Sequence, residues 1–144
     1  MRTKLKIVLP VGKKRAWKYI ATPAGLARWL PSNCTGKIMP GESLKFDWRD
    51  GFSEQFRVVC VGEKHSSLRL RRRDGSDVRF YLHGKMTTLT LEVGYPKTVA
   101  GRNSRVSELP LWGFRLANLK SVALGGPDLR HQLRGRTWRM GFVD

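Results

Sequence analysis

The alternation of apolar and polar residues through the middle of the chain constrains the fold more than any other sequence feature. A period of two runs through five segments, at 44–48, 56–60, 68–71, 78–82 and 88–93. This period is typical of β-strands that bury one face. Two Asp-Gly pairs, Asp50 with Gly51 and Asp74 with Gly75, favour hairpin turns between such strands. The pattern therefore predicts a meander of antiparallel strands that share one apolar face.

The first thirty residues predict one more strand and two short helices. Residues 3–9 alternate as a strand, and Ala16, Trp17 and Ile20 have helical spacing within 12–21. Thr22 is a favourable N-cap and Pro23 a favourable first helical residue, so a second short helix should begin there. Both helices would follow the first strand and precede the meander.

A long helix is predicted after the last strand. Following a polar link at 101–105, we expect it to span 107–124, with Ser107 as its cap and Pro110 in its first turn. One apolar stripe is spaced as on a single helix face and comprises Leu109, Trp112, Leu116, Leu119 and Ala123. The matching faces of the strands should meet this stripe.

The chain of 144 residues has the length of one domain, which we place at 1–126. The remaining residues, 127–144, form a basic segment interrupted by glycine, and we expect it to be irregular. It could still dock through Trp138, Met140 and Phe142.

The order of these elements resembles the START-like (SRPBCC) superfamily. Within it, the sequence is most similar to the family related to the C-terminal domain of the activator of heat-shock protein 90 ATPase. Residues 17–20, 22–30 and 111–120 carry the resemblance. It implies an α+β helix-grip fold, in which a curved antiparallel sheet of six to seven strands wraps around the long C-terminal helix. It further implies an apolar cavity between the sheet and the helix, and connects the chain with stress response.

Aromatic and aliphatic residues of the predicted inner face are candidates for lining that cavity, although they could equally fill a solid core. Glu54 and Arg72 share the inward parity of their strands and should lie diagonally opposite each other. They could anchor a ligand or form a salt bridge at the rim of the sheet. The full candidate set is Trp17, Leu26, Trp29, Phe46, Trp48, Glu54, Phe56, Val58, Leu70, Arg72, Phe80, Leu91, Trp112, Leu116 and Leu119.

The charge of the chain suggests a second kind of site. Lys and Arg number 28 against 11 Asp and Glu, so the formal net charge is +17, which attracts polyanions such as nucleic acid, anionic lipid or an acidic protein. Matching the apolar faces across each turn would align basic residues on the outer face of the sheet. The predicted row is Lys45, Arg57, Arg71 and Arg79, with Arg69 and Arg49 close by; it is either an anion-binding stripe or ordinary solvated surface.

The sequence contains no pattern that indicates catalysis, a cofactor or a metal. Its three histidines are scattered, and it has no P-loop, dinucleotide-binding or nucleophile-elbow motif. Cys34 and Cys60 should be free thiols, as suits a reducing cytoplasm. No stretch approaches the length of a membrane span.

We therefore expect a protein that binds a small hydrophobic ligand rather than an enzyme, although the superfamily also includes cyclase-like enzymes. The alternative is a cochaperone-like or polyanion-binding protein that acts through its basic surface.

Overall fold

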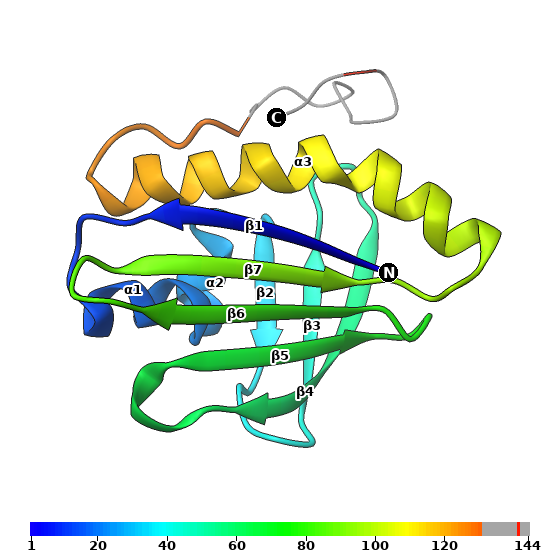
Figure 1. The fold of residues 1–144 in the computed structure, drawn as a ribbon, viewed down its shortest axis with the longest axis horizontal. Coiled ribbons are helices and arrows are strands. Elements are labelled where there is room, and N and C mark those ends of the chain that lie inside the picture. The colour runs from blue at the N-terminus through cyan, green and yellow to red at the C-terminus, as the bar shows by residue number, and fades with distance from the viewer. Residues whose placement is uncertain (131–140, 142–144) are drawn as a thin grey trace.

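The computed structural model describes residues 1–130 and 141. Within them, seven strands form one antiparallel sheet in the order β1-β7-β6-β5-β4-β3-β2, which confirms the predicted α+β architecture (Figure 1). The strand bounds are β1 Arg2–Val8, β2 Asn33–Gly36, β3 Ser43–Asp47, β4 Ser53–Val61, β5 Ser67–Arg72, β6 Asp77–His83 and β7 Thr88–Gly94. The first strand pairs with the last, so β1 forms one edge of the sheet next to β7, although the whole meander separates them in the sequence.

Three α-helices accompany the sheet in the described residues: α1 Lys13–Ile20, α2 Pro23–Ala27 and α3 Val99–Ala123, with a short 3-10 turn η1 at Glu63–His65. The predicted start of α2 is confirmed, because the Thr22 hydroxyl accepts a hydrogen bond from the Gly25 amide at 2.9 Å. Only glycine fits at position 25, since a Cβ there would lie 1.8 Å from the Lys18 carbonyl oxygen. Figure 1 shows α1 and α2 behind the strands and α3 running beside β1.

The long helix begins eight residues earlier than the sequence predicted. Its cap is Thr98, whose hydroxyl accepts from the Gly101 amide at 3.0 Å, and Ser107 lies in the helix interior. The polar residues at 101–105 are therefore helical and not a link. They resembled a linker because most of them face solvent, where a helix needs no apolar residue.

The phase of α3 is also partly different from the prediction. Trp112, Leu116 and Leu119 are buried against the sheet as predicted, but Leu109 is 44% exposed. The preceding residue, Glu108, takes the inward position one turn before Trp112 and bonds to the Trp112 indole. The prediction for Leu109 was wrong because an apolar side chain was assumed to occupy this position.

The hairpins at both Asp-Gly pairs are displaced by two residues from the predicted registers. Each loop has three residues, at 49–51 and 73–75, and ends in a glycine with positive φ, +83° at Gly51 and +87° at Gly75. Glycine adopts this left-handed conformation without the steric cost that a Cβ imposes. The strands therefore pair Leu44 with Phe56 and Leu70 with Val78.

This shift breaks the predicted basic row across the sheet. Lys45 lies opposite Gln55 rather than Arg57. Arg71 lies opposite Asp77 rather than Arg79. The pairing of Arg57 with Arg71 is confirmed, as is that of Val58 with Leu70.

The interior is one cluster of buried side chains between the sheet and the helices. Its largest fully buried members are aromatic and include Trp29, Trp112, Phe46, Phe56 and Phe80. The Trp29 indole donates to the Tyr19 carbonyl oxygen at 2.9 Å, which satisfies its polar atom in the core.

The first residues after α3 return along the helix and are held there by side chains. The buried Asn118 donates to Asp128 at 3.0 Å and accepts from the Leu129 amide at 2.7 Å. Arg130 donates to the carbonyl oxygens of Ala27 and Pro31 at 3.0 and 2.6 Å. The segment is irregular but docked up to this point; Trp138, Met140 and Phe142 lie outside the described residues.

Both cysteines are free, as predicted. Cys34 is buried, and burial, followed by the charge of Asp47, raises the pKa of its thiol to about 11. This thiol therefore stays protonated and unreactive at neutral pH. No helix of the described residues has the length and apolarity that crossing a bilayer requires.

Candidate functional site

A cluster of charged and aromatic side chains lies where the start of β4 and the end of β5 meet α3. Glu54 and Arg72 form the contact that their parity predicted, with Arg72 Nε 2.8 Å from Glu54 Oε1. The contact is an ion pair, and Arg72 Nε makes no hydrogen bond within the described residues. Only 9% of the Arg72 side chain is exposed, so this charge depends on its protein partners.

Glu108 of α3 is the second partner of Arg72 and ties the helix to the sheet. Arg72 Nη1 donates to its two carboxylate oxygens at 3.0 and 3.1 Å. The same carboxylate accepts from the Tyr95 hydroxyl at 2.9 Å and from the Trp112 indole at 3.2 Å. Sequence reasoning missed Glu108, although its spacing of four residues from Trp112 placed it on the buried helix face.

Arg115 completes the cluster through aromatic contacts. Its guanidinium carbon lies 4.4 Å from the ring centroid of Trp48 and 4.6 Å from that of Trp112, within the range of cation–π attraction. The Trp48 indole in turn donates to Glu54 at 3.1 Å. Arg115 was also missed, because in the sequence it is one arginine among many on a basic chain.

The electrostatics of this cluster suit binding better than proton transfer. Burial lowers the pKa of Arg72, but the carboxylates of Glu54 and Glu108 outweigh it and the pKa is raised. Burial and then the charge of Glu108 raise the pKa of Tyr95. Burial and the charge of Arg72 lower the pKa of Arg115 to about 10. Neither arginine gives up its proton near neutral pH, and Tyr95 keeps its own.

The residues predicted to line a cavity all lie on the inner side of the sheet or on the helices that cover it. Trp17, Trp48, Glu54 and Arg72 are partly buried. The others belong to the fully buried cluster: Leu26, Trp29, Phe46, Phe56, Val58, Leu70, Phe80, Leu91, Trp112, Leu116 and Leu119. Burial in one cluster is common to a filled core and a lined cavity, so the cavity stays a prediction.

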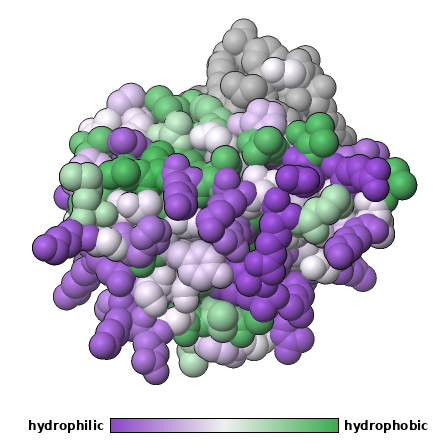
Figure 2. All heavy atoms as spheres, viewed as in Figure 1, coloured by the Kyte–Doolittle hydropathy of each residue, from purple (hydrophilic) through white to green (hydrophobic). Residues whose placement is uncertain are grey.

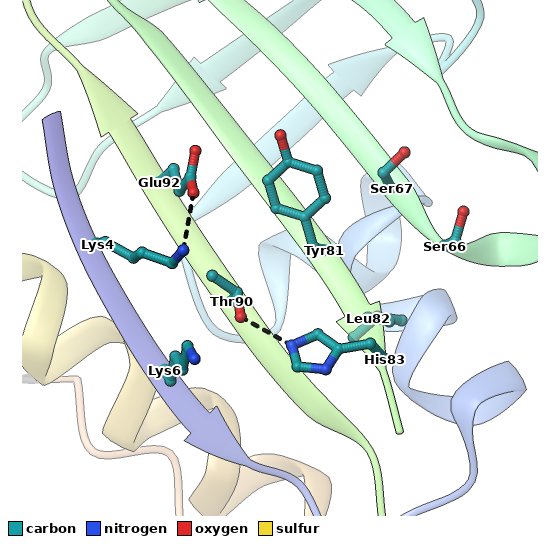
Figure 3. A pocket seen from close by; sticks show the side chains of 9 residues that line it. All are labelled: Lys4, Lys6, Ser66, Ser67, Tyr81, Leu82, His83, Thr90 and Glu92. Atoms are coloured by element: carbon teal, nitrogen blue, oxygen red, sulfur yellow. Dashed lines mark hydrogen bonds and ion pairs between the residues drawn. The ribbon is translucent and has the colours of Figure 1, made fainter. Parts of the chain in front are cut away.

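The outer face of the sheet has a shallow depression of about 420 Å³ that the sequence did not predict (Figure 3). Lys4 and Lys6 lie on one side of it, and Glu92 binds Lys4 at 3.4 Å. On the other side His83 lies 3.0 Å from the Thr90 hydroxyl. The remaining lining residues are Ser66, Ser67, Tyr81 and Leu82.

Part of the predicted anion-binding surface is neutralised within the protein. Arg69 and Arg79 both contact Asp77 Oδ2 at 2.8 Å, and Lys45 lies 3.5 Å from Asp47. Burial raises the pKa of Asp77, but the hydrogen bonds from Arg79 and Arg69 prevail and lower it. These contacts leave less positive charge free on the face than the sequence suggested.

Arg57 and Arg71 remain available on this face. They lie opposite each other and are exposed, and no carboxylate of the described residues pairs with either. Figure 2 shows the hydrophilic side chains gathered over the front strands. The surface therefore keeps a smaller basic patch than predicted.

Comparison with known proteins places the fold. No protein-family model and no curated protein matches the sequence. Among solved structures, the protein SSP2350 from Staphylococcus saprophyticus has a TM-score of 0.76 at 11% identity, over 90% of this chain and 96% of that one. The Aha1 dimer from Colwellia psychrerythraea has a TM-score of 0.69 at 16% identity, over 85% and 96%.

The AHSA1-like protein from Aeromonas hydrophila has a TM-score of 0.67 at 16% identity, over 92% of this chain and 100% of that one. These similarities confirm the resemblance at the level of the fold, which the chain shares with the Aha1 and AHSA1-like structures. Because unrelated activities share such folds, the function has to come from the site itself.

Proposed function

We propose that the protein binds a small hydrophobic ligand between α3 and the inner face of the sheet. The observation that carries this proposal is the character of the interior, which is mostly aromatic and aliphatic and borders the polar cluster around Arg72. Binding sites for small molecules are mostly apolar, with a few polar groups that fix orientation. The apolar interior and this cluster together match that description. The charged groups of the cluster keep their charge near neutral pH, which favours a binding protein over an enzyme.

A bulky substitution in the interior should weaken this binding. Val58 is fully buried on β4, so Val58→Phe places a ring in the proposed space. We expect it to reduce the affinity for a neutral apolar fluorescent probe, N-phenyl-1-naphthylamine, at least tenfold. The measurement is a fluorescence titration of the folded protein, with thermal unfolding to confirm that the variant folds despite a packing cost of about 1–3 kcal/mol.

The matched control is Val8→Phe, because Val8 is 39% exposed on β1 and the same substitution there adds no bulk to the interior. It should leave the affinity unchanged. Failure of the unaltered protein to bind the probe would contradict the proposed function, as would equal binding by the Val58 variant.

The second candidate is polyanion binding by the outer face of the sheet. The specific observation that favours it is the exposed pair Arg57 and Arg71, where like charges lie directly opposite each other without a described acidic partner. A polyanion would relieve that repulsion. The cochaperone-like alternative is a prediction from resemblance, because fold alone does not determine partners.

Changing both Arg57 and Arg71 to Ser should reduce affinity for a single-stranded oligonucleotide and flatten its salt dependence. The slope of log K against log salt is negative, and loss of two phosphate contacts should reduce its magnitude by about 1.4. The control is the double change Lys14→Ser and Arg15→Ser on α1, which removes the same charge from exposed positions elsewhere. If the two double variants give the same curves, net charge alone drives the binding and the patch has no role.

A further inference from the structure

Arg115 is a partly buried cation that lacks an acceptor. Although its guanidinium lies over the rings of Trp48 and Trp112, none of its N–H groups bonds to any residue that the structure describes. Charged groups removed from water are normally paired or hydrogen-bonded, because leaving them bare costs several kcal/mol. Arg115 is only partly buried, and none of its nitrogens is among the buried unpartnered atoms of the described residues, so its donors stay free for a ligand.

Two other largely buried arginines show the usual pattern. Arg72 binds Glu54 and Glu108, and Arg130 binds Asp128 and three backbone carbonyl oxygens. The exception at Arg115 therefore does not reflect a general lack of acceptors in this fold. It is local to the end of the interior where the aromatic residues meet the polar cluster.

The neighbours of Arg115 hold its position without using its donors. The indoles contact the guanidinium through their rings, and cation–π contact leaves the N–H groups at the edge of the plane free. That edge has the fork geometry that binds an oxyanion through two parallel hydrogen bonds. The guanidinium also keeps its proton at neutral pH, so a ligand would meet a full positive charge.

The adjacent charges favour a singly charged headgroup. Glu54 and Glu108 carry two negative charges beside the two positive charges of Arg72 and Arg115. One added negative charge compensates for the lack of an acceptor at Arg115, whereas a second would face two carboxylates already present. Among oxyanions, this arrangement selects a carboxylate over a phosphate dianion.

We propose that Arg115 binds the carboxylate of an amphipathic ligand whose apolar body lies between α3 and the sheet. This inference rests on the proposed function and specifies its ligand class. The ligand is an apolar molecule that bears one carboxylate group, and Trp48 and Trp112 position the arginine that receives it.

The test compares three ligands with the same apolar chain: dodecanoate, dodecanol and dodecyl phosphate. Each displaces N-phenyl-1-naphthylamine from the protein, and the readout is the dissociation constant of each. We expect dodecanoate to bind at least tenfold more tightly than dodecanol and more tightly than dodecyl phosphate. In Arg115→Gln the preference for dodecanoate over dodecanol should disappear, while the affinity for dodecanol stays within about twofold.

The control is Arg102→Gln, which removes the same charge from an exposed position of α3 and should leave all three affinities unchanged. Arg115→Lys provides a second variant if the glutamine variant unfolds; it keeps the charge but loses the fork, so the preference should shrink without vanishing.

The outcomes separate the two proposals. Equal binding of dodecanoate and dodecanol by the unaltered protein overturns the role of Arg115 and leaves the hydrophobic site standing. A preference that survives in Arg115→Gln also overturns it, and tighter binding of dodecyl phosphate overturns the selection for a single charge. If none of the ligands displaces the probe, or the probe itself does not bind, the proposed function fails and the inference fails with it.

Discussion

Replacing Arg72 with alanine should destabilise the protein by about 3–5 kcal/mol, because removing one partner of a buried ion pair leaves the remaining charge uncompensated. Here one arginine forms ion pairs with two carboxylates, Glu54 from β4 and Glu108 from α3. The loss should appear in the free energy of unfolding measured with denaturant. The neighbouring Arg71 is the control, since Arg71→Ala changes an exposed residue of the same strand and should cost less than about 0.5 kcal/mol.

A further variant separates unpaired charge from lost packing. Combining Arg72→Met with Glu54→Gln and Glu108→Gln removes all three charges and should recover much of the stability lost in Arg72→Ala. A loss in Arg72→Ala no larger than in Arg71→Ala would show that the ion pairs do not hold the helix against the sheet.

Replacing Trp112 with alanine should cost about 3–5 kcal/mol, as expected for truncating a large side chain in a packed interior. Trp112 is 1% exposed, donates to Glu108 and lies beneath Arg115. Leu109→Ala is the informative comparison, because the sequence placed Leu109 on the same face whereas the structure leaves it 44% exposed. Its truncation should cost less than about 1 kcal/mol.

The pair of variants thus tests the phase of α3. Chemical denaturation of each gives the free energy of unfolding directly. Similar losses at both positions would support the apolar stripe predicted from the sequence, with Leu109 buried. A loss below about 1 kcal/mol at Trp112 would mean that the helix is not docked there.

The sequence predicted which face of each strand is buried, except at Cys60, which was expected on the buried face and is exposed beyond a β-bulge. It did not predict the register of two hairpins. Burial repeats every two residues, so it distinguishes a shift of one residue and cannot detect a shift of two. At Gly51 and Gly75 the missing information was the loop length, which follows from a left-handed glycine at the third position. The predicted pairing of Val58 with Leu70 was right, although a β-bulge between Val58 and Cys60 shifts the register nearer the turn by one residue, to Cys60 with Arg69.

The pattern of buried faces also explains which residues of the candidate site could be predicted from the sequence. Glu54 and Arg72 could be paired in advance because both break an otherwise apolar inner face. Glu108 and Arg115 could not, because a helix was expected to present only apolar residues to the sheet. Their roles depend on the exact phase of α3, which in turn depends on the cap at Thr98.

Native mass spectrometry of protein purified gently from cells that express it can detect a ligand between α3 and the sheet without a chosen probe. We expect a small-molecule adduct that dissociates on denaturation and is depleted in Val58→Phe. The released molecule should be apolar and carry one carboxylate. Protein that is free of any small molecule, and that still binds no apolar probe, would contradict the claim that the space between α3 and the sheet is a ligand site.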